Sequence, residues 1–547
     1  MTTTAASAPR PTWQAACASF DWAQVHAALG WKPGEKVSLG ESIVDRHVDS
    51  TRTALVSIDR DGNERRLGYR ELSEASNRFA NLLRRLGVAK GDRVAGMMPR
   101  CPEVLVAIIG TLKAGAIYVP IFTGFGPDAV SYRLGHAQVK VLVTHVDVLD
   151  QVPADFAGTA VVAGSGRPLP AGGVDFAAAC AAESTRFEPV LLDRDEPAAI
   201  IYTSGSTGQP KGGTIAVNFL AAVWPYITCG LDLRTEDVLW PTGDPGWGYG
   251  FVCYLGALAA GATVVSVARN PTAEIALEVL ERQGVTNLAT TPTLLRSLLV
   301  LDDEALMRPR LRLRAISSCG EPLNAKVVES FRRVWGLTPM DHFGATEYAL
   351  PIGNHNAIDM EVKAGSMGLP CPGFRMAIVD EAGNELPPGE VGFIGKRTGP
   401  ECRYWLNYWN DPQASAKLVR HGWIVTGDLG RRDADGYFWF EGRDDDMIKS
   451  AGYRIGPFEV ESALLKHPAV AEAAVVGKPD AMRGQIVVAY VVLRPGYTGS
   501  DALTEELVQA VKTSVGKHQY PRVVEYVDSL PKTETGKIQR FALRARG

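Results

Sequence analysis

Apolar positions near the start of the chain alternate between helical spacing and short continuous runs. Between 70 and 86 they recur every three or four residues, which predicts an amphipathic helix that ends at Gly87. A strand is predicted over 93–98, a helix beginning at Pro102, and a second strand over 116–121. Comparable apolar runs follow near 138–146, 197–202, 260–267, 285–290 and 311–317. Strands separated by helices of this length predict a large α/β body of doubly wound, parallel sheets.

The pattern changes near residue 366. Short strands alternating with turns indicate a β-rich subdomain over about 366–442. A helix, two strands, a helix and a strand are then predicted, at 457–466, 470–476, 485–493, 501–515 and 522–527. We therefore expect an N-terminal domain over 1–443 and a small α+β C-terminal domain over 444–547. No low-complexity linker separates them, which favours a hinge over a tether.

Composition argues against several classes of protein. Of the 547 residues, 46% are hydrophobic and 22% are charged, as in ordinary soluble proteins. Lys and Arg number 57 against 61 Asp and Glu, whereas a protein that binds nucleic acid by neutralising phosphates is normally more basic. The eight cysteines form no CxxC pair, which argues against zinc ribbons and against a dense disulfide framework.

Two segments bear on the location of the protein. Residues 1–10 contain no apolar core and are therefore not a secretory signal, and the arginine at position 10 is a thin basis for an organellar presequence. The most apolar stretch, 104–122, contains Lys113 and Pro120, so it is interpreted as a buried helix leading into a buried strand and not as a membrane span. We expect a cytoplasmic protein without a membrane span.

A loop rich in Gly, Ser and Thr follows the predicted strand at 197–202. Residues 201–212 read Ile-Tyr-Thr-Ser-Gly-Ser-Thr-Gly-Gln-Pro-Lys-Gly. The glycines allow the backbone to approach a phosphate, the hydroxyls offer donors, and Lys211 adds positive charge. Pro210 precedes the lysine and no Ser or Thr follows it, so the loop is not a P-loop. On composition alone, a flexible turn is the alternative.

The loop resembles the signature [ST]-S-G-[ST]-[ST]-G-x-P-K-G of the adenylate-forming superfamily, which includes acyl-CoA synthetases, luciferases and the adenylation domains of peptide synthetases. Six further segments resemble that family's motifs in the same order: 318–323, 341–347, 423–428, 442–446, 451–455 and 531–540. The resemblance covers nearly the whole chain, and the order of the motifs makes it specific. Residues 131–134 and 244–250 resemble acetyl-CoA synthetases and their medium-chain relatives in particular.

The resemblance implies an AMP-forming acid:CoA ligase. A carboxylate attacks the α-phosphorus of ATP, pyrophosphate leaves, and the acyl-adenylate then reacts with coenzyme A. Such chemistry depends on positioning and on neutralising charge. Lys537 is implied as the catalytic residue of adenylation, because its ammonium can bridge the carboxylate and the α-phosphate. Glu347 is implied as the protein ligand of Mg²⁺, which prefers carboxylate and phosphate oxygens.

On the nucleotide, the resemblance places Ser206 and Thr207 at the phosphates, Phe343 on the adenine, and Asp428 and Arg443 at the ribose. The other residues implied in ATP or AMP binding are Thr203, Ser204, Gly205, Gly208, Lys211, Gly320, Glu321, Pro322, Asp341, His342, Gly344, Thr346 and Arg454. Taken alone, an Asp in a TGD turn is more often a turn former, and a lysine near the C-terminus is more often solvated.

The second half-reaction implies a rotation of the C-terminal domain, with Asp445 as the hinge. The residues implied in binding coenzyme A are Gly452, Tyr453, Arg483, Tyr520 and Arg522. For Arg483 and Arg522, a solvated surface charge is an equal alternative. Acetylation would remove the charge of Lys537, so this residue is also a candidate site for regulation by a lysine acetyltransferase and deacetylase.

The acid itself is predicted from the acyl pocket, which the resemblance assigns to Trp247, Gly248, Tyr249, Cys319 and Gly344. Acetate enzymes carry a Trp at the position of Gly344, and its indole closes the pocket. A glycine there favours a medium-chain, branched or aromatic acid. Tyr249 could shrink the pocket again, so a short-chain ligase for acetate, propionate or butyrate is the alternative.

Two other classes fit the sequence less well. A carrier-protein adenylation enzyme or a luciferase-like oxygenase is disfavoured by the acetate-like and medium-chain motifs and by the absence of a carrier domain in this sequence. A non-catalytic nucleotide sensor on the same fold would be expected to lack Lys537 or Glu347, and both are present.

Overall fold

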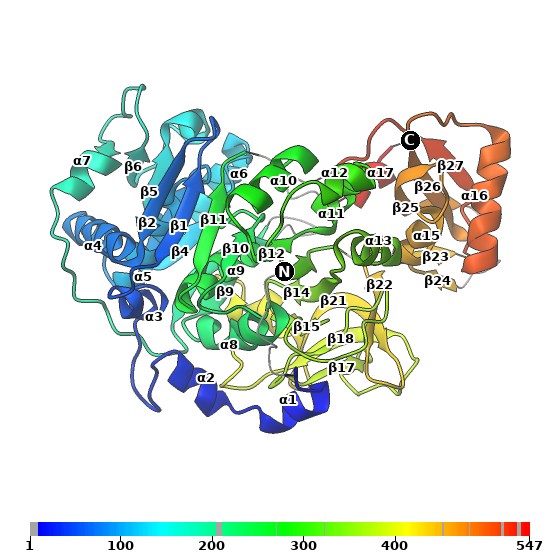
Figure 1. Ribbon diagram of the computed structural model, residues 1–547, viewed down its shortest axis with the longest axis horizontal. Coiled ribbons are helices and arrows are strands. Elements are labelled where there is room, and N and C mark those ends of the chain that lie inside the picture. Colours follow the sequence, from blue (N-terminus) through cyan, green and yellow to red (C-terminus); the bar gives the residue numbers. More distant parts are fainter. Residues whose placement is uncertain are drawn as a thin grey trace.

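The structure is a computed structural model that describes residues 9–203, 210–269, 271–321, 323–450, 453–480, 482–515, 519–532 and 538–546. Two large sheets form the body, a smaller β-sheet follows, and the C-terminal elements lie at one end (Figure 1). This mixed α/β architecture confirms the predicted fold class.

The first body sheet has eight strands in the order β19-β9-β8-β4-β3-β5-β6-β7. From β8 to β7 all neighbours are parallel, whereas β9 and β19 continue the sheet antiparallel. The strands are β3 (Arg93–Met97), β4 (Ile117–Pro120), β5 (Val139–His145), β6 (Thr159–Ala163), β7 (Val174–Asp175), β8 (Pro197–Thr203), β9 (Lys211–Ala216) and β19 (Trp405–Tyr408). The associated helices are α4 (Tyr69–Arg85), α5 (Pro102–Lys113), α6 (Pro127–His136) and α7 (Phe176–Ala181), with the 3₁₀ turn η2 (Val146–Gln151).

The second body sheet has nine strands in the order β16-β15-β14-β13-β12-β10-β11-β1-β2. Its central strands are parallel, and β2, β15 and β16 are antiparallel at its two edges. The strands are β1 (Thr53–Ile58), β2 (Glu64–Gly68), β10 (Val238–Pro241), β11 (Thr263–Val267), β12 (Asn287–Thr290), β13 (Ala315–Cys319), β14 (Pro339–Ala345), β15 (Ala349–Gly353) and β16 (Leu369–Pro370). The helices are α8 (Phe219–Pro225), α9 (Gly248–Ala259), α10 (Ala273–Arg282), α11 (Pro292–Leu298), α12 (Asp303–Met307) and α13 (Ala325–Trp335), with the π-helical turn η3 (Tyr226–Gly230).

The apolar stretch at 104–122 forms α5 and β4, as predicted. Every residue of α5 except Glu103 is buried, including Lys113. The Nζ of Lys113 donates to Asp45 Oδ1 at 2.6 Å and to Asn77 Oδ1 at 2.7 Å. This pairing explains how a lysine is accommodated in a buried helix. None of the helices within the described residues is long and apolar enough to cross a membrane.

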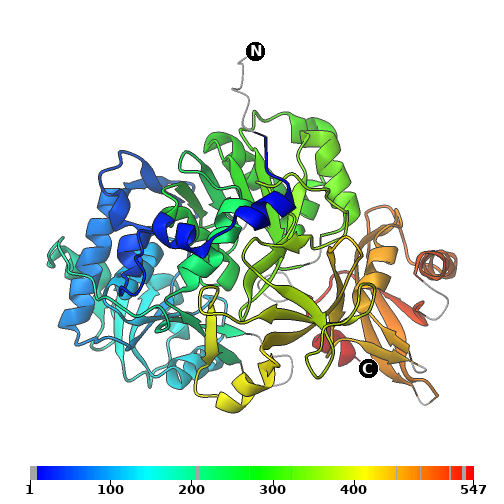
Figure 2. The same cartoon turned by 90° about the horizontal axis from the view of Figure 1, so that it is seen from below.

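Three short helices and a 3₁₀ turn precede the body sheets: α1 (Trp13–Ser19), α2 (Trp22–Ala28), α3 (Leu39–Ile43) and η1 (Asp45–His47). Helices α1 and α2 lie along the outside of the body (Figure 2). The Trp13 Nε1 donates to the Pro370 carbonyl at 2.8 Å, and Phe20 packs against Gly373. The segment 13–20 is thus attached next to β16.

A five-stranded sheet of β17 (Met376–Val379), β18 (Gly392–Arg397), β20 (Val419–Arg420), β21 (Trp423–Arg432) and β22 (Phe438–Arg443) forms the predicted β-rich region. Helix α14 (Pro412–Leu418) also belongs to this part of the chain. Two strands depart from the prediction, because β19 and β16 lie within 366–442 yet pair with β9 of the first body sheet and with β15 of the second. The span therefore contributes to three sheets.

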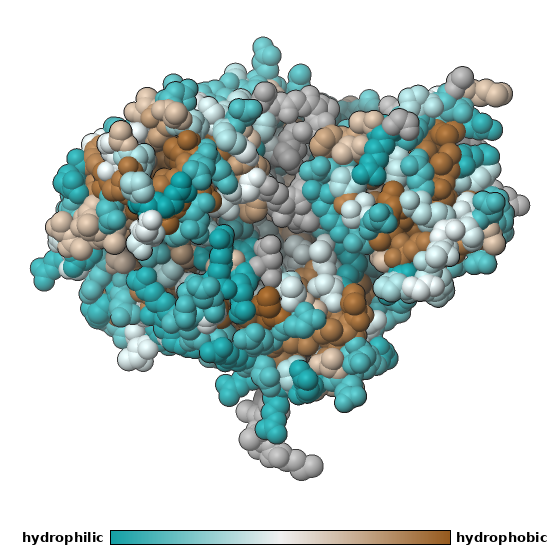
Figure 3. Space-filling model, turned by 90° about the horizontal axis from the view of Figure 1, so that it is seen from above, coloured by the Kyte–Doolittle hydropathy of each residue, from teal (hydrophilic) through white to brown (hydrophobic). Residues whose placement is uncertain are grey.

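The C-terminal elements follow the predicted order and have an apolar core of their own. They are β23 (Ile448–Ser450), β24 (Tyr453–Ile455), α15 (Pro457–Leu464), β25 (Val470–Asp480), β26 (Gly484–Leu493), α16 (Asp501–Ser514), β27 (Val523–Tyr526) and α17 (Arg540–Arg544). The surface is hollowed between them and the body (Figure 3). A domain boundary at 443 and 444 stays a prediction.

Candidate active site

The predicted ribose residues lie side by side on two paired strands. Asp428 on β21 is in register with Arg443, the last residue of β22, and an Arg443 Nη1 lies 3.4 Å from Asp428 Oδ1. Thr426 Oγ1 donates to Asp428 Oδ2 at 2.6 Å, and Arg443 Nε donates to Asp445 Oδ1 at 3.0 Å. Although burial opposes the charge of Arg443, the carboxylates of Asp428 and Asp445 raise its pKa. The predicted hinge residue therefore contacts the predicted ribose residue.

Glu347, the predicted magnesium ligand, lies between β14 and β15 and is only 6% exposed. Tyr408 Oη donates to Glu347 Oε1 at 2.5 Å. Burial raises the pKa of Glu347, and the neighbouring charges of Asp428 and Arg443 act on it in opposite directions. The predicted magnesium ligand thus lies near the predicted ribose residues.

Lys211, from the predicted phosphate loop, lies near Tyr408 of the same site. β9 begins at Lys211, and the Lys211 Nζ lies 5.3 Å from the centre of the Tyr408 ring. The pairing of β19 with β9 brings Tyr408 there, and Thr346 packs on Gly213 of β9. Thr203 ends β8 on the other side of the loop. Sequence reasoning did not identify Tyr408, because its position depends on a pairing between strands almost 200 residues apart.

Buried polar contacts hold the backbone around Glu347. Tyr348 Oη donates to the Ile394 carbonyl at 2.5 Å and accepts from the Thr426 N–H at 2.9 Å. The Lys396 Nζ donates to the Tyr348 carbonyl at 2.9 Å, and burial lowers the pKa of this lysine to about 8. Tyr348 therefore connects Glu347 to the segment that carries Asp428. Neither Tyr348 nor Lys396 was among the predicted site residues.

Two aromatic rings and two cysteines come together at the predicted acyl pocket. Tyr226 Oη and Tyr249 Oη lie 3.1 Å apart, and burial together with the nearby Cys253 and Cys319 raises the pKa of both hydroxyls. Tyr226 and Cys253 are additions to the predicted set. Tyr226 lies in a π-helical turn, a feature that often marks functional sites but leaves no clear pattern in a sequence.

His342 borders this pocket. It is in register with Cys319 on the adjacent strand, and its ring meets that of Tyr226 edge-on, with 5.0 Å between centroids. Both ring nitrogens are buried, and backbone groups of Ser318 and Asn354 act on the ring. Burial lowers the pKa of His342 to about 3, so the ring is neutral at physiological pH. Its predicted contact with the nucleotide stays a prediction.

Gly344 and Gly248 differ in the space around them. A Cβ at Gly344 would collide with the carbonyl oxygen of Ala349 and lie 3.0 Å from Leu350 Cδ2, whereas a Cβ at Gly248 would meet nothing within 4 Å. The volume beside Gly344 is therefore filled by β15, and the argument from a missing indole to a larger pocket does not hold in this structure. Gly248 does leave open space. Trp247 packs against Phe122 and Phe125, with centroid distances of 5.8 and 6.0 Å.

The predicted adenine-side residues are held by local contacts. Arg296 Nη2 and Thr293 Oγ1 bond to the two carboxylate oxygens of Glu321, at 2.7 and 2.9 Å, and Gly320 has a left-handed φ of 102°. The Phe343 ring lies 6.1 Å from that of Tyr348 and 6.4 Å from that of Phe440. A nucleotide role for these residues stays a prediction.

Comparison with known proteins identifies the family. Residues 44–398 match the family described as AMP-binding enzyme, and 459–537 match the AMP-binding enzyme C-terminal domain. The chain is 39% identical to the acetyl-coenzyme A synthetase of Bacillus subtilis (strain 168) over 96% of its own length and 93% of that protein. It is 36% identical to the mitochondrial acyl-coenzyme A synthetase ACSM3 of Mus musculus, over 89% and 86%.

A solved structure agrees with these matches. The crystal structure of the Brucella canis acyl-CoA synthetase superposes with a TM-score of 0.79 at 39% identity, covering 98% of each chain. The chain belongs to the AMP-binding enzymes. This result confirms the predicted adenylate-forming family and the predicted class, an AMP-forming acyl-CoA synthetase.

Several predicted residues of the synthetase lie outside the described residues. They are Ser204, Gly205, Ser206, Thr207 and Gly208 of the phosphate loop, Pro322, Gly452 and Lys537. For Tyr453 and Arg454 the structure describes the backbone only, in β24. The roles of all these residues stay predictions.

Two of the predicted coenzyme A residues lie where neighbouring strands of the C-terminal sheet begin. Arg483 directly precedes β26, Arg522 directly precedes β27, and these strands are parallel neighbours. The Arg522 guanidinium lies 4.2 Å from the centre of the Tyr520 ring, and the Lys512 Nζ lies 4.5 Å from it. The synthetase thus gathers positive charge around a half-buried aromatic ring, a combination that suits a phosphorylated, purine-containing ligand.

Asp341 gives a pH-dependent prediction for the synthetase. Burial raises its pKa from 3.8 to about 8, so between these values the folded protein holds a proton that the unfolded chain has lost. The stability contributed by this proton is present at low pH and is lost as pH rises toward 8. Asp341→Asn is expected to become progressively more stable than wild type between about pH 4 and pH 8, measured by thermal unfolding. Parallel pH profiles of the two proteins would contradict this.

Proposed function

We propose that this synthetase activates a medium-chain, branched or aromatic carboxylic acid with ATP and Mg²⁺ and transfers the acyl group to coenzyme A. The observation that carries the choice of acid is the cluster formed by Tyr226, Tyr249, Cys253 and Cys319, next to the ring of His342. These side chains are aromatic rings and thiols, and such groups favour an apolar acyl chain beside them.

The short-chain alternative has an observation of its own. The acetyl-coenzyme A synthetase of Bacillus subtilis is 39% identical over nearly the whole chain, and β15 fills the space beside Gly344. A pocket narrowed in this way, with Tyr249 at its wall, would suit acetate, propionate or butyrate.

The residues present fit a magnesium ion that enters with ATP. The described residues contain no group of three or more His, Cys, Asp or Glu that could hold a metal on its own. One buried carboxylate, Glu347, fits the way Mg²⁺ is usually held, by one or two carboxylates together with substrate phosphates. The ion would neutralise phosphate charge. Glu347 would bind it, and Tyr408 would orient Glu347 through the 2.5 Å hydrogen bond.

We assign the binding of ATP, of the acid and of coenzyme A to the following side chains. The Lys211 ammonium and the hydroxyls of Ser206 and Thr207 would bind the phosphates, and Asp428 would accept hydrogen bonds from the ribose. Lys537 would hold the carboxylate against the α-phosphate during adenylation. For the second half-reaction, Arg483 and Arg522 would bind the phosphates of coenzyme A, with Tyr520 against its adenine.

A panel of acids tests the substrate. Acetate, propionate, butyrate, hexanoate, octanoate, isovalerate and benzoate would be compared by AMP release that depends on coenzyme A. The proposal expects kcat/KM to rise from acetate toward a longer or aromatic acid, since each buried methylene contributes about 0.8 kcal/mol, and to fall where the pocket ends. A maximum at acetate would establish the short-chain alternative.

The hinge gives a second prediction. Asp445→Pro fixes φ at the proposed pivot, so it is expected to trap one arrangement of the C-terminal domain and to impair one half-reaction while sparing the other. Asp445→Ala is the matched control, because it removes the contact with Arg443 but leaves the backbone free. Each half-reaction would be measured separately, by ATP–pyrophosphate exchange and by thioester formation from supplied acyl-adenylate. Equal loss of both in a folded Pro variant would contradict the hinge.

Acetylation of Lys537 is proposed as a regulatory modification. It would replace an ammonium by a neutral amide and so remove the charge that the adenylation step uses. A fully acetylated sample is expected to lose activity, and treatment with a lysine deacetylase is expected to restore it. Unchanged activity in the acetylated sample would exclude this regulation.

A further inference from the structure

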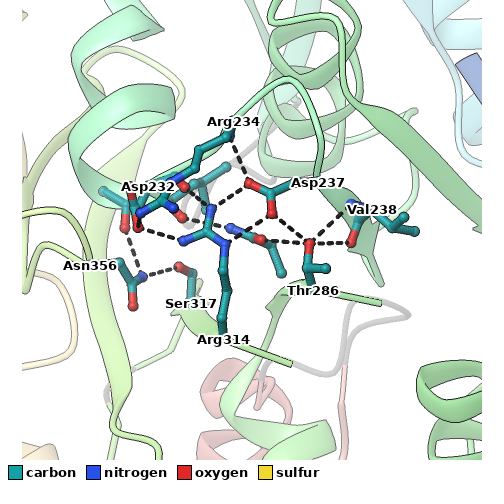
Figure 4. A network of polar contacts seen from close by, with 11 residues as sticks. Asp232, Arg234, Asp237, Val238, Thr286, Arg314, Ser317 and Asn356 are labelled. Atoms are coloured by element: carbon teal, nitrogen blue, oxygen red, sulfur yellow. Dashed lines mark hydrogen bonds and ion pairs between the residues drawn. The ribbon is translucent and has the colours of Figure 1, made fainter. Parts of the chain in front are cut away.

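A polar network surrounds the end of the π-helical turn that carries Tyr226 (Figure 4). The turn begins at Tyr226, next to Tyr249 and His342, and the Leu231 N–H donates to the Tyr226 carbonyl at 2.8 Å to close it. Leu231 and then Asp232 follow the turn, and the φ of Asp232, 51°, is left-handed. A left-handed residue other than Gly persists where the surrounding structure holds it in place.

Three consecutive carbonyls at the end of this turn each accept a side-chain hydrogen bond. Asn356 Nδ2 donates to the Gly230 carbonyl at 2.8 Å, Asn287 Nδ2 donates to the Leu231 carbonyl at 2.9 Å, and an Arg314 Nη2 donates to the Asp232 carbonyl. Asn287 and Asn356 are only 1% and 5% exposed, so these contacts are shielded from water. The end of the turn is therefore fixed at three successive points.

The network is anchored in the second body sheet. Arg314 lies between the carboxylates of Asp232 and Asp237 and bonds to both, with Nε to Asp237 Oδ1 at 2.9 Å (Figure 4). Thr286 Oγ1 donates to the same Asp237 oxygen at 2.7 Å. Asp237, Thr286 and Arg314 directly precede β10, β12 and β13, which are neighbours in the sheet.

The other end of these strands borders the proposed acyl pocket. β13 ends at Cys319, and the adjacent β14 carries His342, which is in contact with Tyr226. The turn thus joins the network at the start of the strands to the pocket residues near their ends. A shift of Gly230 or Leu231 would be transmitted through the π-turn to the Tyr226 hydroxyl.

We propose that Arg314, Asn287 and Asn356 are positioning residues for acid selectivity: they fix the turn η3 so that Tyr226 and Tyr249 form a wall of defined shape for the acyl chain. This inference rests on the proposed placement of the acid beside Tyr226. The three residues act through Tyr226 and are not expected to touch the acid.

The test uses Arg314→Met and Asp232→Gly. Asp232→Gly removes the carboxylate, and Gly adopts the left-handed backbone without strain. This variant is therefore expected to fold even if Arg314→Met does not. In each, the ratio of kcat/KM between the two acids that wild type distinguishes most is expected to change about fivefold or more, while KM for ATP and for coenzyme A stays within about twofold. Arg314→Lys keeps the positive charge, so it is expected to retain part of the wild-type selectivity ratio that Arg314→Met loses.

Lys113→Met is the matched control. Lys113 is a buried cation in an ion pair with Asp45, away from the turn, so its loss should lower the melting temperature without changing the selectivity ratio. Tyr226→Phe is expected to change the ratio in the same direction as Arg314→Met, and the double variant should add little to either, because both act on one group.

The outcomes separate this inference from the proposed function. If Arg314→Met and Asp232→Gly lower the melting temperature but leave the selectivity ratio as in wild type, the network is merely structural and the inference fails. A wild type that prefers acetate would overturn the proposed acid, yet the ratio in the variants would still test the positioning role. If the effects of Arg314→Met and Tyr226→Phe on the selectivity ratio were fully additive, the positioning role would also be overturned.

Discussion

Lys537→Ala is expected to slow adenylate formation by about a hundred- to a thousandfold while leaving thioester formation from supplied acyl-adenylate largely intact. The carboxylate and the α-phosphate are both negative, and the resemblance to the family assigns this ammonium to the place where they meet. A positioned charge of this kind matters only while the two anions approach. Coenzyme A attacks a neutral carbonyl in the second half-reaction, so that step should not need it.

Lys532→Ala is the matched control for this experiment. Lys532 lies five residues earlier in the same segment and forms an ion pair with Glu472 at 2.6 Å, outside the proposed machinery. Its variant should keep both half-reactions. Both half-reactions would be measured on the same preparations of the two variants. ATP–pyrophosphate exchange reports on adenylation, and thioester formation from purified acyl-adenylate reports on the second step. Equal loss of the two half-reactions in Lys537→Ala would remove the residue from its assigned role.

The elements that sequence reasoning predicted well are those with a strong local pattern. α4 shows helical spacing over 17 residues and ends just before Gly87, whose φ of 77° suits glycine. α5 and β4 were predicted within a few residues because Pro102 and the following apolar run mark them. The order of the C-terminal elements was predicted for the same reason.

Features that depend on distant pairing were missed. β19 is a short strand within the β-rich span, and nothing in its sequence indicates that it pairs with β9. That pairing places Tyr408 on Glu347, so the missed strand also hid a site residue. Tyr348 and Lys396 were not predicted, because their role depends on hydrogen bonds to backbone carbonyls that only the folded structure brings close.

Gly344 illustrates a different limit of sequence reasoning. The absence of a side chain was interpreted as open volume, but whether volume is open depends on what packs against the glycine. Here a Cβ would collide with the Ala349 carbonyl oxygen, and Leu350 Cδ2 lies 3.0 Å from the Cβ position. A glycine can mark close backbone packing as readily as an empty pocket.

Gly344→Ala and Gly344→Trp are therefore expected to impair the enzyme toward every acid. A single added methyl would have to displace the Ala349 carbonyl on the paired strand β15, and overpacking of this kind typically costs about 1–3 kcal/mol, more for an indole. Because Glu347 lies in the connection between β14 and β15, the same displacement would move the proposed magnesium ligand and lower adenylation for short and long acids alike.

Gly248→Ala is the matched control for this last experiment, because a Cβ there meets nothing within 4 Å and the residue begins helix α9. It should leave the melting temperature nearly unchanged. Thermal unfolding and the acid panel would be measured on all three variants. A folded Gly344→Trp enzyme that kept acetate activity but lost the longer acids would show that β15 yields to the indole. Position 344 would then set the length of the acyl pocket after all.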